Sequence, residues 1–361
     1  MTDRTAKDIF VTGFPGYLAT KLLARLVVDR PGQVFHLLVL PGFMEHAEAT
    51  LGELNRNVPG VLQRCRLHAG DITAARLGLT SRQWRELTGS VGEVYHLAAV
   101  YDLGVAKPLA YAVNVEGTRN VLALAEAAKG SRLVYFSTCY VAGDRSDLIL
   151  EDELQMGQGF RNYYEETKYH AEVEVRSRVD LPVVIIRPSI VAGDSKTGAI
   201  PKFDGPYFII QLLARLEKRG LLPPFLVLPR LGRSRAKVNL VPVDFLVDAV
   251  TAIVDSPRST GATFHLADPA PLPVWRLYEL IMQAFGIRLA GWLPGAVLEA
   301  SAAIPHLDRI LGFPRQLLSY FNHLGEFDTA NVTSILAGKG ITCPSVESYL
   351  QLMIDFTRSQ V

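Results

Sequence analysis

The stretch Ile9-Phe10-Val11-Thr12-Gly13-Phe14-Pro15-Gly16-Tyr17-Leu18-Ala19 lies near the start of the chain and decides its fold. An apolar run ends in two glycines, and apolar residues then recur at helical spacing through Val27. This order predicts a strand, a tight turn and a helix whose free N–H groups face the turn, an arrangement that suits a pyrophosphate. Gly13 would form the turn, Gly16 would admit the phosphates, and Ala19 would let the helix pack on the strand. An ordinary glycine turn uses the same residue types, so the motif needs support from elsewhere in the chain.

Composition describes a globular protein and excludes several partners. The chain has 361 residues, of which 49% are hydrophobic, and 37 basic residues nearly balance 36 acidic ones. We find no basic stripe, and therefore expect no nucleic-acid partner. No apolar run approaches the roughly 18 residues of a membrane span, and the polar start is unlike a signal peptide. Cys65, Cys139 and Cys343 lie far apart, which indicates reduced thiols in a cytoplasmic protein and no metal site.

Alternation of short apolar runs with helical patterns organises the first half of the chain. The predicted fold is α/β, a doubly wound parallel Rossmann sheet with helices on both faces and a smaller, mostly helical C-terminal region. Residues 1–193 would form the Rossmann domain, and residues 194–361 the substrate region, interleaved with the sheet over about 238–268. The predicted strands are 8–12, 34–40, 65–69, 92–97, 132–137, 182–187 and 262–266. The predicted helices are 17–29, 44–55, 81–88, 108–128, 160–179 and 274–285, with a further helix inside 240–254.

Tyr164 and Lys168 form the first candidate catalytic pair. Four residues apart on a helix, they share one face. A free tyrosine has a pKa near ~10, and a neighbouring ammonium is expected to lower it toward a useful range. The pair would then serve as the acid or base of a carbonyl–alcohol interconversion. A solvated helix face is the alternative, because this spacing also arises by chance.

Thr138 strengthens that interpretation. It follows the apolar run 133–136, so its hydroxyl would lie at the carboxyl end of a parallel strand, where ligands bind. There it could hydrogen-bond the substrate oxygen beside Tyr164. The alternative role is to cap the last backbone groups of the strand.

These motifs, in this order, make nearly the whole chain resemble the extended short-chain dehydrogenase/reductase superfamily, which binds NAD(P) in a Rossmann fold. The resemblance implies that Thr138, Tyr164 and Lys168 are catalytic, and that Asn114 holds a water that relays protons. It also implies contacts to the dinucleotide from Gly70-Asp71-Ile72, where the acidic side chain meets the adenine, and from His96-Leu97-Ala98-Ala99. The residues expected to bind the cofactor are Thr12, Gly13, Phe14, Pro15, Gly16, Tyr17, Leu18, Asp71, Ile72, Leu97, Ala98, Ala99, Lys168, Arg187, Pro188, Ser189 and Ile190.

Within the superfamily the chain is most similar to fatty acyl reductases and to thioester reductase domains. The residues concerned are 12–16, Ala98 to Leu103, Arg187 to Val191 and Asn239 to Asp244. This branch implies reduction of an acyl thioester or aldehyde, with the acyl group on a separate carrier or on coenzyme A. It also gives a slight preference for NADP(H), although Leu38 to Gly42 carries neither the acidic residue nor the arginine that usually selects between NAD and NADP.

Other functions on the same scaffold stay open. They are a hydroxysteroid- or dihydroflavonol-type alcohol dehydrogenase, a nucleotide-sugar epimerase, and a dinucleotide-binding scaffold without catalysis. The superfamily also implies a homodimer that uses the helix carrying the tyrosine. Two further segments are less specific: Glu151 to Glu153 is expected to be a solvated acidic loop, and the apolar stretch Leu289 to Leu324 is either an acyl-chain tunnel or a buried core helix.

Overall fold

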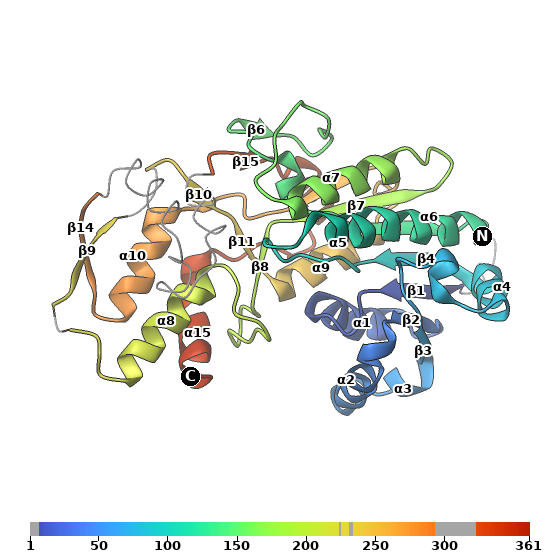
Figure 1. The fold of residues 1–361 in the computed structure, drawn as a ribbon, viewed down its shortest axis with the longest axis horizontal. Coiled ribbons are helices and arrows are strands. Elements are labelled where there is room, and N and C mark those ends of the chain that lie inside the picture. Colours follow the sequence, from blue (N-terminus) through green and yellow to red (C-terminus); the bar gives the residue numbers. More distant parts are fainter. Residues whose placement is uncertain (1–6, 224, 231–233, 293–322) are drawn as a thin grey trace.

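A seven-stranded parallel sheet forms the larger part of the molecule (Figure 1). The computed structural model describes residues 7–223, 225–230, 234–292 and 323–361. The order β12-β7-β5-β4-β1-β2-β3 reverses direction between β1 and β4, which confirms the predicted doubly wound α/β fold and puts the ligand crevice beyond their carboxyl ends. The strands are β1 (Asp8–Thr12), β2 (Phe35–Val39), β3 (Cys65–Ala69), β4 (Val91–His96), β5 (Arg132–Phe136), β7 (Val183–Pro188) and β12 (Thr263–Leu266).

Helices cover both faces of this sheet because each presents one apolar stripe to it. In α1, Leu22, Leu23, Leu26 and Val27 are each 1% exposed. Burying a side chain of this size contributes about 1.5–3 kcal/mol. One face carries α1 (Tyr17–Asp29), α2 (Met44–Asn57), α9 (Val243–Val254) and α14 (Ala330–Leu336), with α3 (Val61–Arg64) beside them. The other carries α4 (Ser81–Ser90), α6 (Gly117–Ala127) and α7 (Tyr163–Arg176).

The single helix expected over 108–128 is interrupted. It consists of α5 (Lys107–Tyr111), a π-helical segment η3 (Ala112–Glu116) and α6. Periodicity alone did not predict the break, since a π-helical turn shifts the phase of the apolar stripe by only one residue. Asn114 lies within η3, so the interruption coincides with a residue expected at the site.

A second apolar core lies beside the sheet, built by α8 (Pro206–Lys218), α10 (Val274–Ala284) and α15 (Val346–Ser359), which group together in Figure 1. Four two-stranded sheets lie outside the seven-stranded sheet. They are β8 (Ile190–Ala192) with β11 (Leu240–Pro242), β10 (Lys237–Val238) with β13 (Leu272–Pro273), β9 (Val227–Arg230) with β14 (Arg288–Trp292), and β6 (Leu148–Ile149) with β15 (Glu326–Phe327). Short 3-10 turns are η1 (Pro41–Phe43), η2 (Ala75–Gly78) and η4 (Cys139–Ala142).

The chain crosses back to the sheet late in its sequence. After β11 it forms α9, which packs on α1, and then β12, which pairs with β7 as the outermost strand. The strand expected at 262–266 and the helix expected inside 240–254 are therefore both present. Most of the stretch 289–324, with its choice between tunnel and core helix, lies outside the described residues. Among those described, no helix has both the length and the apolar character needed to cross a membrane.

Candidate functional site

The turn between β1 and α1 can be made only by glycine. Gly13 has φ +89°, and a Cβ on it would lie 2.8 Å from the backbone nitrogen of Ala98. A Cβ on Gly16 would lie 2.6 Å from the Gly13 carbonyl oxygen, which accepts the Gly16 N–H at 2.8 Å. The turn thus packs directly against the segment that follows β4, at the switch point of the sheet. Phe14 is buried beneath it, while Pro15 and Leu18 are partly exposed.

A buried hydrogen-bond chain runs from this turn to η3. Ala98 N–H donates to Thr12 Oγ1 at 3.1 Å, and Thr12 Oγ1 lies 2.8 Å from His96 Nδ1. His96 Nε2 lies 3.0 Å from Thr118 Oγ1, whose only proton is donated to the Asn114 carbonyl at 2.6 Å. Burial lowers the pKa of His96 to about 3, so the ring is neutral. Thr118 must therefore accept from Nε2–H, and Thr12 must donate to Nδ1, which fixes the tautomer.

Asn114 connects three segments at the site. Its Oδ1 accepts the Val100 N–H at 2.9 Å, and its Nδ2 donates to the Val100 carbonyl and to Thr167 Oγ1 at 2.9 Å. Thr167 in turn donates to the Tyr163 carbonyl on α7. The side chain expected to hold a relay water thus bonds to protein groups, and the contact with Thr167 joins it to α7. The water itself stays a prediction.

Thr138 and Tyr164 meet at the carboxyl end of β5. Thr138 accepts the Tyr140 N–H at 3.2 Å and so caps the start of η4, which follows the strand. Burial raises the pKa of Tyr164 to about 12, and a hydrogen bond with the Thr138 side chain lowers it in part. The Tyr164 phenol is therefore protonated at neutral pH and is a proton donor in this form.

Lys168 contacts the end of β5. Its Nζ donates to the Phe136 carbonyl at 2.6 Å, and burial lowers its pKa to about 7. The charge is thus only partly present at neutrality, and it faces the end of β5. Burial raises the pKa of the Tyr164 phenol, and the expected lowering of that pKa by Lys168 stays a prediction.

Arg187 has its guanidinium enclosed by protein. It is 1% exposed and donates to both oxygens of Glu172 on α7, at 2.6 and 3.0 Å. Glu172 also accepts from Ser137, the neighbour of Thr138, at 2.6 Å. The side chain expected along the nicotinamide instead anchors the strand end to α7. The sequence pattern does not reveal the roles of Glu172 and Ser137, because only the fold brings them to this ion pair.

The residues after β7 lie next to Thr138. The Pro188 carbonyl accepts from the Thr138 hydroxyl at 3.4 Å, and Ile190 begins β8. Ser189 Oγ is buried, and no group in the described part of the chain hydrogen-bonds it. Unpaired buried hydroxyls are rare in folded proteins, so this atom is available to a ligand in the crevice.

The residues expected near the adenine lie after β3. Asp71 Oδ1 accepts the Thr73 N–H at 2.8 Å, which shapes the loop. Ile72 is buried against Gly117 at the start of α6. Beyond β2, Leu40 is 45% exposed and is followed by η1.

Glu151 is not part of a solvated loop, contrary to expectation. It is 2% exposed and accepts from the backbone N–H groups of His265 and Asn331, at 2.9 and 2.6 Å. Burial raises its pKa to about 7. The partners are far away in sequence, so no local pattern could have revealed the contact.

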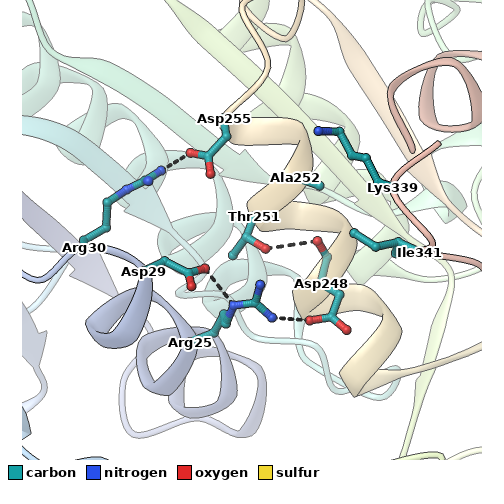
Figure 2. A pocket seen from close by; sticks show the side chains of 9 residues that line it. All are labelled: Arg25, Asp29, Arg30, Asp248, Thr251, Ala252, Asp255, Lys339 and Ile341. Atoms are coloured by element: carbon teal, nitrogen blue, oxygen red, sulfur yellow. Dashed lines mark hydrogen bonds and ion pairs between the residues drawn. The ribbon is translucent and has the colours of Figure 1, made fainter. Parts of the chain in front are cut away.

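A separate surface pocket of about 510 Å³ lies between α1 and α9 (Figure 2). Arg25 bridges Asp29 and Asp248, at 2.7 and 2.5 Å, and Arg30 pairs with Asp255. None of the residues expected to bind the cofactor lines it. These ion pairs join α1 to α9, so the charged residues around the pocket have a structural role.

These residues fit a dinucleotide. At Gly13 and Gly16 the turn has no room for a Cβ, so the backbone is open to a phosphate there. At the same edge of the sheet, the buried Ser189 hydroxyl has no hydrogen-bond partner among the described residues. The sheet order, the glycine turn and the helix with Tyr164 and Lys168 define an NAD(P)-dependent oxidoreductase of the extended short-chain dehydrogenase/reductase class. Residues 11–250 match the family model described as male sterility protein, and the chain belongs to this family.

Comparisons with individual proteins agree. The chain is 29% identical over 279 residues to the nonribosomal peptide synthetase asaC of Aspergillus flavus, covering 73% of this chain and 26% of that protein. It is 26% identical over 282 residues to the L-2-aminoadipate reductase of Schizosaccharomyces pombe, covering 72% of this chain and 19% of that one. The chain thus spans about a quarter or less of these relatives.

Solved structures extend the likeness to nearly the full chain. The terminal R domain of the myxalamid PKS-NRPS pathway has a TM-score of 0.79 and 26% identity, with 98% of this chain and 91% of that chain covered. The R domain of a nonribosomal peptide synthetase from Mycobacterium tuberculosis has a TM-score of 0.70 and 21% identity, with 98% and 91% covered, and shares the fold.

Proposed function

We propose that the chain reduces an acyl thioester to an aldehyde, with NADPH as the preferred reductant and the acyl group carried on a phosphopantetheine arm or on coenzyme A. Support comes from relatives and from chemistry. Similar proteins include peptide synthetases and a thiolation-reductase di-domain from an archaeal non-ribosomal peptide synthetase. The observation that carries the proposal is the meeting of the Tyr164 phenol and the Thr138 side chain at the carboxyl end of β5.

The chain's own groups would manage the proton and the substrate oxygen. Bound NAD(P)H supplies a hydride to the carbonyl carbon. Tyr164 donates its proton to the developing alkoxide, and the Thr138 hydroxyl orients that oxygen. The resulting hemithioacetal breaks its C–S bond, and an aldehyde and a free thiol leave. The Tyr164 phenol is protonated at neutral pH, so it is in the form that the reductive direction requires.

The test follows nicotinamide absorbance with NADH and NADPH separately, against an acyl-coenzyme A, an aldehyde, a hydroxysteroid and a nucleotide sugar. Tyr164→Phe is expected to lower turnover by about 10²–10⁴-fold while nicotinamide binding, followed by fluorescence, survives. Tyr163→Phe is the matched control, because this neighbour on α7 is 43% exposed and its loss should change little. Near-normal activity of Tyr164→Phe would contradict the mechanism. Activity on the hydroxysteroid or the nucleotide sugar, and none on the acyl-coenzyme A, would favour the alcohol dehydrogenase or the epimerase over the thioester reductase.

A further inference from the structure

Tyr135 occupies an unusual position beneath Lys168. It lies on β5, where its register partners are His96 on β4 and Ile185 on β7, and it is 0% exposed. The Lys168 Nζ lies 4.5 Å from the centroid of its ring. Within the described residues no group meets the Tyr135 hydroxyl in hydrogen-bond geometry. Burial raises the pKa of Tyr135 well above its usual value. The hydroxyl therefore stays neutral, and the ring is the part that Lys168 contacts.

The surroundings of Lys168 contain little else to hold a charge. On α7, Glu172 is one turn away and raises the pKa of Lys168, but its oxygens already accept from Arg187, Ser137 and Arg176. On β4, the His96 ring is neutral. On β7, the Arg187 charge is paired with Glu172, and on α7 the Tyr164 phenol is protonated. Lys168 Nζ contacts the Phe136 carbonyl and the face of Tyr135.

We propose that Tyr135 is a positioning residue whose aromatic face keeps Lys168 charged and in place for the reaction, and that its hydroxyl has no part in this. An ammonium over a desolvated aromatic face is stabilised relative to the neutral amine. The effect matters at this position because Lys168 has a pKa of about 7, so a modest change in its surroundings alters the charged fraction near neutrality. The proposal rests on the proposed function for its catalytic consequence, and on geometry alone for its effect on Lys168.

The two parts of Tyr135 can be separated. Tyr135→Phe removes the unpaired hydroxyl and keeps the ring. Tyr135→pentafluorophenylalanine keeps the ring shape and reverses the charge distribution of its face. The first measurement is the titration of Lys168 in the full chain by NMR of ¹³C-labelled lysine side chains, with Lys168→Met to assign the signal. The midpoint is expected to be equal in the wild type and Tyr135→Phe, and lower by about one pH unit in the fluorinated variant.

Two results would overturn the proposal: an unchanged midpoint in the fluorinated variant, or an equally large shift in Tyr135→Phe. The second measurement is the pH profile of NADPH oxidation with octanoyl-coenzyme A. The midpoint of the part of this profile that Lys168 controls should shift together with the NMR midpoint. A purely structural role of Tyr135 would leave the midpoint of the profile unchanged. If the wild type does not reduce the thioester, the proposed function fails, and the NMR titration still decides the role of Tyr135.

Discussion

Replacing Arg187 by methionine tests whether the Glu172 ion pair anchors the strand end to α7. Methionine keeps much of the volume but leaves Glu172, which is 0% exposed, without two charge-assisted hydrogen bonds. The carbonyls of Glu151 and Glu153 lose their donor as well. Removing one partner of a buried pair costs about 3–5 kcal/mol. We expect the free energy of unfolding, measured by urea denaturation at neutral pH, to fall by this amount.

Controls separate burial from charge in this experiment. Arg82→Met breaks an exposed pair with Glu86, whose side chains are 84% and 59% exposed, and is expected to leave the free energy of unfolding nearly unchanged because water screens the pair. The double variant Arg187→Met with Glu172→Leu should cost less than the two single losses added together. A loss below about 1 kcal/mol in Arg187→Met would refute the reasoning, because it would mean that Glu172 is satisfied without Arg187.

The sign of the pH dependence follows from Glu172. Burial alone would raise its pKa, but the Arg187 charge and hydrogen bonds lower the pKa below its usual value. The folded state therefore holds this carboxylate ionised, and its contribution is present above about pH 4.3 and is lost as the pH falls through the folded pKa. The wild type should lose this increment on acidification, and Arg187→Met should lose much less.

Two further changes follow from the site. Gly13→Ala places a Cβ at φ +89° and 2.8 Å from the Ala98 nitrogen. It should lower the free energy of unfolding by about 2–4 kcal/mol and abolish nicotinamide binding, followed by fluorescence. The control is Gly42→Ala, whose Cβ would lie more than 4 Å from every non-neighbouring atom of the described residues and which should cost under about 0.5 kcal/mol. Lys168→Met removes a group whose folded pKa of about 7 lies below its unfolded value, so it should raise the free energy of unfolding by on the order of 2–4 kcal/mol near pH 6, an advantage that vanishes toward about pH 10.5; a pH-independent effect would contradict this.

The sequence was sufficient for the features that local pattern determines. Gly13, Gly16 and the apolar stripe of α1 specify strand, turn and helix within one short segment. Thr138 and Tyr164 could be placed together because parallel strands share a carboxyl edge, where the start of α7 also lies. The bounds of β1, β3 and α1 agree with the predicted ranges for the same reason.

The features that escaped prediction depend on distant partners. Glu151 looked like a solvated carboxylate, and only the arrival of His265 and Asn331 makes it a buried acceptor. The hydrogen bond from Lys168 to the Phe136 carbonyl could not be predicted, because spacing on a helix puts Lys168 near Tyr164 but says nothing about the neighbouring strand. Such contacts are tertiary, and a residue pattern does not encode them.

The outermost strand has a consequence for anyone who cuts or transplants this chain. β12 and α14 come from the second half of the sequence, yet they complete the wall of the sheet next to β7. A fragment that stops at residue 193 would expose β7 as a bare edge, a template for aggregation. During synthesis the sheet cannot be completed until the residues of β12, beyond residue 260, have been made. A fragment for recombination should therefore include the strands up to β12 and the helix α14, and should not be cut near residue 193.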